Sequence, residues 1–160
     1  MAVVNTDKGI VVGVVSDSHG LLRPEVIEAL HGCDRILHAG DIGKPEVIQK
    51  LELLAPVTAI RGNVDRGDWA DAWPETERFE LQAQRFYMLH NLRDLDFDPG
   101  SQGIDVVISG HSHKPHQYRK DGVLYLNPGS IGPRRFSLPI ALSRLILGET
   151  TVSVEMLTLG

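Results

Sequence analysis

The sequence predicts an α/β sandwich, and two observations lead to this fold class. The first half alternates short apolar runs, mostly β-branched, with runs of helical periodicity, a pattern typical of β-α-β units. The second half contains strand-like runs separated by short turns, which is typical of β-hairpins. The 160 residues show no internal repeat, low-complexity stretch or linker, so we expect residues 1–160 to form a single domain.

The first half is expected to form a β-α-β-α-β unit. Residues 10–16, IVVGVVS, are an apolar run expected of a strand buried on both faces. Residues 23–32 predict a helix, with Pro24 near its start and Gly32 where it would stop. A strand at 35–39, a helix at 44–54 and a strand at 56–60 are expected to follow. The short connections favour parallel strands with right-handed crossovers.

The second half is expected to consist mainly of hairpins. Runs that flank Ala83, a run containing Lys-Asp-Gly and two runs around Gly-Glu-Thr have the character of paired strands. The expected elements are 77–82 with 85–90, a buried strand at 104–109, a hairpin within 116–127, and 139–147 with 151–159. We therefore expect an antiparallel meander that closes the far side of the sandwich.

Composition limits the function classes. The net charge of −5 gives no sign of a broad surface for phosphate backbones, so nucleic acid is not expected as a partner except as a substrate. The single cysteine, Cys33, excludes an intramolecular disulfide and fits a reducing compartment. No apolar run reaches transmembrane length, and residues 1–9 are too weakly apolar for a signal peptide. A cytoplasmic location without a membrane partner is expected; a homo-oligomer stays open.

Polar side chains follow the predicted strands at the point where each one ends. In open α/β sheets, ligands bind outside the carboxyl ends of the strands, so these residues are expected to meet at one edge. The candidates are Asp17, His19, Asp41, Asn63, His90, His111 and His113.

These residue types suit metal ions. Imidazole, carboxylate and amide groups without thiolate fit Mn, Fe, Zn, Ni or Co better than a structural zinc site. In extended backbone, the spacing of Asp17 and His19, and of His111 and His113, puts both side chains on one face. Seven ligands are too many for one ion but suit two ions about 3.5–4 Å apart, a clamp used for phosphoryl displacement. Two divalent ions, two carboxylates and a bridging hydroxide leave a net positive charge that attracts phosphate.

The ordered blocks Asp17-Ser-His19, Gly40-Asp41, Gly62-Asn-Val-Asp65, His90 and Gly110-His-Ser-His113 resemble the signature of the calcineurin-like metallophosphoesterases. The short chain and the Leu126–Ser130 segment resemble the small bacterial and archaeal phosphodiesterase branch, over roughly residues 10–146. The resemblance implies a sandwich of two mixed β-sheets flanked by helices. It also implies one metal held by Asp17, His19 and His113, a second held by Asn63, His90 and His111, and Asp41 as the bridge. Asp41, Asn63, His90 and His111 are then expected to take part in catalysis.

The sequence departs from the family pattern at two positions. Val64 stands where many relatives carry a histidine that assists the phosphate or its leaving group, and valine cannot donate a proton. Asn91 follows His90 where glycine is common. The first departure disfavours hydrolysis of ordinary alkyl monoesters.

Other polar residues carry two interpretations each. Asp65 either orients a ligand or caps its own turn, and His38 is a strand histidine with its hydrogen bonds satisfied or a support for a ligand. Arg134 reaches substrate phosphate or belongs to a solvated loop. His31 and His116 are expected to be exposed, and the two tryptophans, Trp69 and Trp73, are expected to pack against the core rather than wall the substrate cleft.

The predicted function is hydrolysis of a small phosphate ester, with a diester favoured over a monoester, by attack of a metal-bridging hydroxide. Two divalent ions are the expected cofactors, with Mn²⁺ favoured and Fe, Ni, Zn or Co as alternatives. A nuclease or cyclic-nucleotide phosphodiesterase is an alternative within the enzyme class. From another class, the small retromer subunit keeps this fold as a non-catalytic interaction scaffold; the full ligand set argues against that role here.

Overall fold

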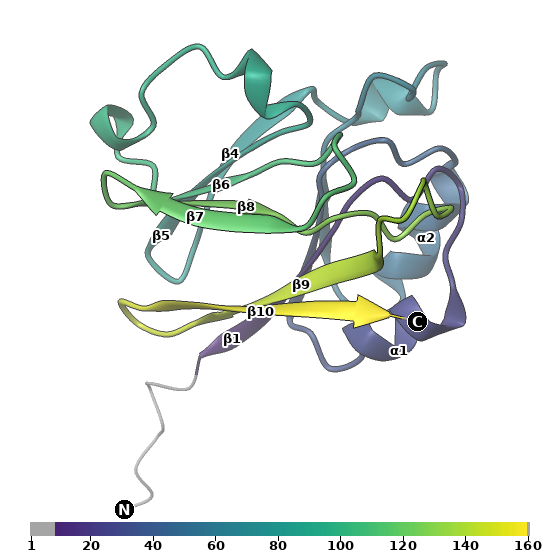
Figure 1. Cartoon of the computed structure of the whole chain (residues 1–160), viewed down its shortest axis with the longest axis horizontal. Coiled ribbons are helices and arrows are strands. Elements are labelled where there is room, and N and C mark those ends of the chain that lie inside the picture. Colours follow the sequence, from purple (N-terminus) through teal and green to yellow (C-terminus); the bar gives the residue numbers. More distant parts are fainter. Residues whose placement is uncertain (1–8, 160) are drawn as a thin grey trace, which may run out of the picture.

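The computed structural model describes residues 9–159 (Figure 1). Residues 1–8, which include most of the segment considered for a signal peptide, lie outside the described part, as does Gly160. The strands are β1 (Ile10–Val15), β2 (Arg35–His38), β3 (Val57–Ala59), β4 (Thr76–Leu81), β5 (Gln84–Leu89), β6 (Val106–Ile108), β7 (His116–Lys120), β8 (Val123–Asn127), β9 (Ile140–Leu147) and β10 (Val152–Leu159). The helices are α1 (Pro24–Leu30) and α2 (Pro45–Glu52), with 3-10 turns η1 (Ala70–Ala72), η2 (Leu92–Asp94) and η3 (Gly100–Gln102).

The strands form two mixed sheets of five strands each, as the resemblance implied. The first sheet has the order β10-β9-β1-β2-β3, in which β1, β2 and β3 pair in parallel. The last hairpin joins this sheet because β9 pairs antiparallel with β1. Figure 1 shows β9, β10 and β1 as one layer beneath the other sheet.

The second sheet corrects the expected antiparallel meander. Its order is β4-β5-β6-β8-β7, and β6 pairs in parallel with both β5 and β8. Only the outer pairs, β4 with β5 and β7 with β8, are antiparallel hairpins. The carboxyl ends of β5, β6 and β8 therefore reach the same edge, which a meander would have prevented.

Alternate side chains of the central strands enter two separate cores. Val12 and Val14 of β1 and Phe86 of β5 belong to the core between the sheets, which is closed to solvent. Val15 instead points toward the helices. It belongs to a second core, to which α1 contributes Leu30 and α2 contributes Leu51. Truncating a fully buried phenylalanine such as Phe86 to alanine typically costs about 3–5 kcal/mol.

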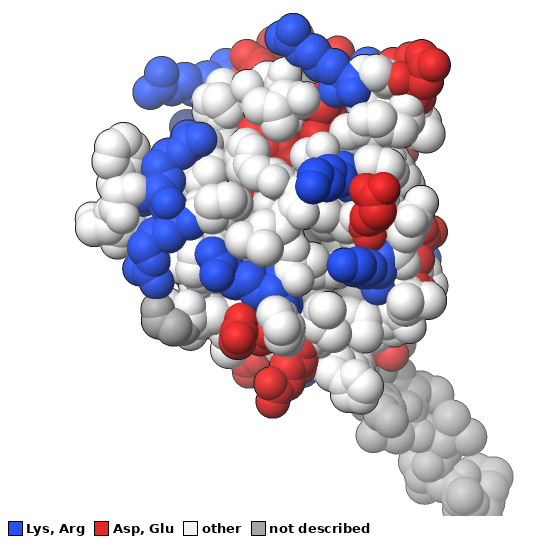
Figure 2. Space-filling model, turned by 90° about the vertical axis from the view of Figure 1, so that its right-hand side faces the viewer, with Lys and Arg blue, Asp and Glu red and all other residues white. Residues whose placement is uncertain are grey.

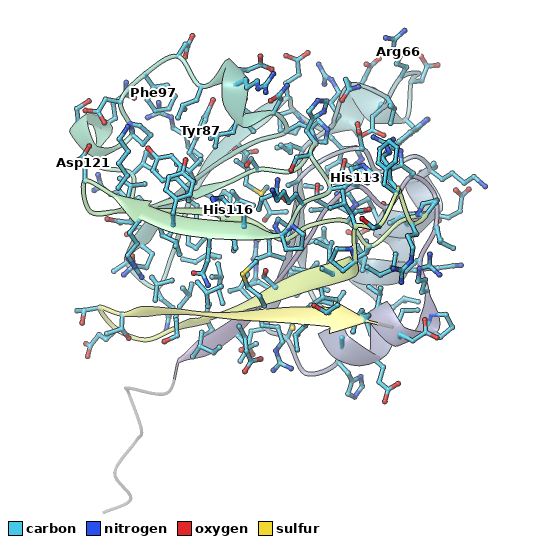
Figure 3. All side chains as sticks on the ribbon, in the orientation of Figure 1. Arg66, Tyr87, Phe97, His113, His116 and Asp121 are labelled. Atoms are coloured by element: carbon cyan, nitrogen blue, oxygen red, sulfur yellow. The ribbon has the colours of Figure 1, made fainter. Side chains whose placement is uncertain are left out.

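Both helices therefore cover the outer face of the first sheet, while an irregular segment covers the second. Residues 91–104, with η2 and η3, pack on the second sheet through Leu92, Leu95 and Phe97. Figure 3 shows Tyr87 of β5 and Phe97 close together on this outer face, and their rings meet edge-on at 5.0 Å. Among residues 9–159, neither helix is long and apolar enough to span a bilayer.

Candidate metal centre

The carboxylate and histidine residues predicted as ligands lie together at one end of the β-sandwich, beyond the carboxyl ends of strands from both sheets. Ligand atoms of Asp17, His19 and His113 lie within 4.8 Å of one another, and so do those of Asp41, His90 and His111. Asp17 and Asp41 follow β1 and β2 of the first sheet. In the second sheet, His90 follows β5, and His111 and His113 follow β6. Figure 3 shows His113 among these loops, at the end of the molecule opposite Asp121.

The first group is enclosed. Asp17 is fully buried and His113 is 3% exposed. The Nε2 atom of His113 lies 3.4 Å from Asp17 Oδ1, and the Nε2 atom of His19 lies 3.7 Å from the same oxygen. The two Nε2 atoms face each other at 3.3 Å. One carboxylate oxygen and two ring nitrogens thus point toward a common centre.

The second group is joined to the first through Asp41. Its Oδ2 atom lies 3.1 Å from His90 Nε2 and 3.7 Å from His19 Nε2, so one oxygen faces both groups. The ring of His111 stands edge-on to that of His90 at 5.2 Å, and His111 is exposed. This placement of Asp41 agrees with a bridging role.

Hydrogen bonds hold each carboxylate by one oxygen and leave the other facing the site. The Ser16 hydroxyl and the His111 backbone N–H donate to Asp17 Oδ2, at 2.6 and 3.0 Å. The Val64 backbone N–H donates to Asp41 Oδ1 at 3.1 Å. Because the bonds from His111 and Val64 cross between loops, they fix the positions of the loops as well as the carboxylates.

His90 is oriented by the backbone. Its Nδ1 lies 2.7 Å from the carbonyl oxygen of Ala39, which can only accept, so Nδ1 carries the proton and donates. Its Nε2 is then left with a lone pair directed at the site. Histidines that bind metal are typically oriented in this way.

The ligand loops have a backbone that the sequence analysis interpreted wrongly. Five candidate ligands, Asp17, His19, Asp41, His111 and His113, have φ between 46° and 73°. The two pairs spaced by one residue therefore lie in left-handed backbone, not in the extended backbone expected, and His111 and His113 face different groups. Left-handed backbone costs a residue with a Cβ roughly 1–2 kcal/mol, and such strain concentrates at functional sites.

Two glycines allow the loops to approach the carboxylates. A Cβ on Gly62 would overlap Asp41 Oδ1, and a Cβ on Gly110 would overlap the hydroxyl of Ser16 and crowd Asp17 Oδ2. Each glycine precedes a candidate ligand, Asn63 or His111.

The charges of the site shift several pKa values. Burial raises the pKa of Asp17, but contacts with His113 and His19 and the charge of His90 outweigh burial, so the pKa is lowered. The contact with Asp17 raises the pKa of His19. Burial lowers the pKa of His90, but Asp41, Asp17 and the Ala39 carbonyl reverse this, and the pKa is raised. Protons and metal ions therefore compete for the same ring nitrogens.

Asn63 lies at the open side of the centre. It is exposed and lines a cleft of about 400 Å³ together with His90, His111 and Arg61. The cleft thus brings together the three residues expected to hold the second ion. It also gives solvent access to that side of the centre.

Asp65 caps its own turn, one of the two roles weighed for it, and also joins two of the ligand loops. Its Oδ2 accepts from the backbone N–H of Gly62 at 2.8 Å, which caps the turn. The same carboxylate accepts from the N–H groups of Ile42 and Gly43, at 3.0 and 2.9 Å. Asp65 therefore ties the loop of Asp41 to the loop of Asn63 without contacting a candidate ligand side chain through any of these bonds.

His38 is fully buried beneath the first group. The Gly40 N–H donates to its Nδ1 at 3.1 Å, so Nε2 carries the proton and donates to the Ser18 hydroxyl at 2.8 Å. That hydroxyl donates to the Ile42 carbonyl at 2.9 Å. Burial lowers the pKa of His38 to about 4, which keeps the ring neutral. His38 thus supports the loop between Asp17 and His19.

The remaining candidates lie outside both ligand groups. Arg134 is exposed in the stretch 133–137, and its contact with substrate stays a prediction. Trp69 and Trp73 pack against the core beneath the helices, as expected. His31 and His116 are both exposed, as expected, and Figure 3 shows His116 at the start of β7.

Three supporting residues were missed by the sequence analysis. Ser16 bonds to Asp17 as described, and the Ser130 hydroxyl donates to the Asp17 carbonyl at 3.0 Å. The Asn127 side-chain amide donates to the Gly110 carbonyl at 2.9 Å. The Leu126–Ser130 segment carries a resemblance to the small phosphodiesterase branch, but no sequence signal shows that it supports the ligand loops, because Asn127 and Ser130 bond to backbone carbonyl groups.

The donor set fits divalent metal ions. Asp17 Oδ1 and His90 Nε2 are buried without a hydrogen-bond partner among the described residues, although each faces the site. Leaving such atoms unpaired is unfavourable, and a cation between them relieves the cost. Both groups contain only carboxylate and imidazole ligands, the types that such ions prefer.

The fold and this site define a class of protein. Residues 10–150 match the family model described as the calcineurin-like phosphoesterase superfamily domain. The chain belongs to this family.

Relatives and solved structures agree with this assignment. A probable metallophosphoesterase of Methanothermobacter thermautotrophicus is 35% identical over 150 residues, covering 86% of this chain and 87% of the relative. A predicted phosphoesterase of Streptococcus pneumoniae has a similar structure, with 26% identity, a TM-score of 0.73, and coverage of 94% of this chain and 90% of its own.

Two further solved structures share the fold. An archaeal phosphodiesterase has a TM-score of 0.77 at 24% identity, covering 94% of this chain and 100% of its own. Vps29 of Entamoeba histolytica, complexed with Zn²⁺, has a TM-score of 0.71 at 21% identity, covering 93% and 99%.

Proposed function

We propose that the protein is a phosphodiesterase that depends on two divalent metal ions. The observation that carries the proposal is the position of Asp41 Oδ2, which faces His90 of one ligand group and His19 of the other. A single shared carboxylate between two groups is what a dinuclear centre requires. Family membership supports the reaction class, phosphate-ester hydrolysis.

The residues that would hold the ions follow from the two groups. Asp17, His19 and His113 would hold one ion, Asn63, His90 and His111 the other, and Asp41 both. When bound, such ions polarise the phosphoryl oxygens and lower the pKa of a water molecule. Mn²⁺ is the favoured metal, with Fe, Ni, Zn or Co as alternatives, because the set lacks thiolate.

The chain itself contributes position and charge. The bonds to Asp17 Oδ2 and Asp41 Oδ1 fix the carboxylates before substrate arrives. His111 is exposed at the mouth of the cleft, where its imidazole can meet a substrate phosphate. Figure 2 shows the end of the molecule that lies at the right in Figure 1; blue Lys and Arg side chains gather along one margin, which favours an anionic substrate despite the negative net charge.

Val64 favours diesters with good leaving groups. Its side chain is 46% exposed at the site, and valine cannot protonate a departing oxygen. An aryloxide leaves without a proton far more readily than an alkoxide does. Aryl diesters are therefore the expected class, ahead of alkyl monoesters; a nuclease or cyclic-nucleotide phosphodiesterase is the alternative within the enzyme class.

A binding scaffold is the alternative from another class. The similar structures include proteins named for vacuolar protein sorting, so the fold alone does not separate the two functions. The convergence of all six carboxylate and histidine candidates in two groups favours the enzyme, since a scaffold does not require it.

A metal screen tests the proposal. Purified protein stripped by a chelator should lose hydrolysis of bis(4-nitrophenyl) phosphate, and Mn²⁺ should restore it with about two ions bound per chain. Asp17→Asn should not be restored, whereas His31→Ala, altered at an exposed residue outside both ligand groups, should behave as wild type. Activity in protein with only trace divalent metal would overturn the proposal, as would restored protein that hydrolyses no ester.

A further inference from the structure

A second, larger groove adjoins the cleft of the candidate metal centre. It has a volume of about 580 Å³ and runs between the segment after His90 and the hairpin of β7 and β8. Asn91 and His111 line both the groove and the cleft. A molecule whose phosphate lies beside His111 can therefore extend one ester arm into the groove.

The groove offers aromatic surfaces. Tyr118 of β7 and Tyr125 of β8 are cross-strand partners, and their rings stack at 4.9 Å with planes 6° apart. The ring of His116 follows Tyr118 at 5.3 Å, and Leu92 of η2 lines the groove with them. Tyr118 is 37% exposed although it is a large aromatic residue. A row of rings of this kind suits a planar group.

The groove is also positively charged. Arg93 and Lys114 line it, and none of the described lining residues is Asp or Glu. The chain as a whole has 21 acidic and 16 basic residues, so a lining without acidic residues runs against its composition. An arm that carries a further negative charge matches these walls better than a neutral one.

We propose that this groove binds a nucleotide-like ester arm of the substrate, with its planar base along the tyrosines and a second phosphate near Arg93 and Lys114. The inference rests on the proposed function and narrows its substrate class from aryl diesters in general to aryl diesters whose other arm is a nucleotide. The volume agrees, because pockets for small ligands span roughly 300–1,000 Å³. Stacking of a base on an aromatic side chain is strong enough to favour one arm over another by about tenfold in kcat/KM.

Matched substrates test the groove. Methyl 4-nitrophenyl phosphate and thymidine 5′-(4-nitrophenyl phosphate) share a leaving group and differ in the arm; a third substrate adds a 3′-phosphate to the thymidine. With wild type, kcat/KM should rise at each step. Tyr118→Ala should lower kcat/KM about tenfold for both thymidine substrates and leave the methyl ester unchanged. Arg93→Gln with Lys114→Gln should remove the gain from the 3′-phosphate.

Arg119→Gln is the matched control, because Arg119 lies on the same strand but bonds to the carbonyl of Val152, outside the groove. It should leave all three values unchanged. If wild type processes the methyl and thymidine esters equally, or if Tyr118→Ala lowers all three values alike, the groove does not bind the arm.

A binding measurement separates this inference from the proposed function. Thymidine 5′-methylphosphonate, whose only ester bond has an alkoxide leaving group, should bind wild type more tightly than methylphosphonate does in calorimetry, and Tyr118→Ala should remove the difference. Protein that shows this preference but hydrolyses no ester leaves the groove standing and overturns the phosphodiesterase. Protein that hydrolyses the methyl ester without the preference overturns the groove alone.

Discussion

The two halves of the candidate metal centre differ in their access to solvent. The half formed by Asp17, His19 and His113 includes a fully buried carboxylate and a histidine that is 3% exposed. The half formed by Asp41, His90 and His111 ends in an exposed histidine and is completed by the exposed Asn63 at the cleft. Under the proposed function, the enclosed half would retain an ion and the open half would admit substrate.

The largest expected effect separates the two halves directly. Loss of a residue that supports a metal ligand typically lowers activity about 10–100-fold. His113→Ala and His111→Ala, which remove a ligand itself, should each lower kcat/KM by more than this. Excess Mn²⁺ should partly restore His111→Ala, because water can replace an exposed ligand, but not His113→Ala. The measurement is kcat/KM against Mn²⁺ concentration, with metal content per chain. Equal restoration of both variants would remove the distinction between the halves.

Val64 tests the chemistry of the open half. A proton donor typically contributes about 10²–10⁴-fold, so wild type should hydrolyse aryl diesters faster than alkyl monoesters by a factor in this range. Val64→His should narrow the gap by raising alkyl turnover, since the side chain at this position is exposed and has room. Val64→Ala is the control and should leave the gap unchanged. Wild-type protein that processes both classes equally must have another donor.

Asp65 tests the connection between loops that serves both halves. Asp65→Ala removes the acceptor for the N–H groups of Ile42, Gly43 and Gly62 and should lower kcat/KM about 10–100-fold. Excess Mn²⁺ should recover part of this loss, because every ligand remains. Asp68→Ala, at an exposed position in the same loop, should act as wild type. A loss no larger for Asp65→Ala than for Asp68→Ala would reduce Asp65 to a turn residue.

The smallest expected effect concerns stability beneath the enclosed half. The pKa of His38 is about 4 in the folded chain, against an ordinary value of 6.5. Below pH 6.5 the unfolded chain binds a proton at His38 before the folded chain does. The stability that the neutral His38 ring contributes is therefore complete above pH 6.5 and is lost as pH falls toward 4. Between pH 7 and 5, wild type should lose about 2 kcal/mol of unfolding free energy that His38→Gln does not lose. Urea titrations at both pH values measure it; equal losses would contradict a neutral, buried His38.

The sequence predicted the elements of this fold better than their pairing. Strand and helix positions follow from local apolar patterns and from Pro24, which begins α1. The parallel placement of β6 between β5 and β8 depends on contacts between distant segments, and the hairpin signals at Ala83 and Asp121 gave no hint of it. The expectation of a meander extended a local signal beyond its range.

The candidate site shows the same division. The histidines and carboxylates could be listed because each follows a strand, and strand ends meet at one edge. The left-handed backbone at Asp17 and His113 could not, because residues other than glycine rarely adopt it and only the surrounding hydrogen bonds make it stable. Supporting residues such as Ser130 act on backbone carbonyls, which every residue has.

Each ligand group takes members from both sheets, since Asp17 and Asp41 follow strands of the first sheet and His113 and His90 follow strands of the second. An ion held by such a group binds the two layers to each other. Because only the docked arrangement presents the full set, loading with metal favours that arrangement over any state in which the layers have parted. Under the proposed function, a loaded centre would therefore cross-link the β-sandwich, and the concentration of free metal would help to determine how firmly the two sheets stay together.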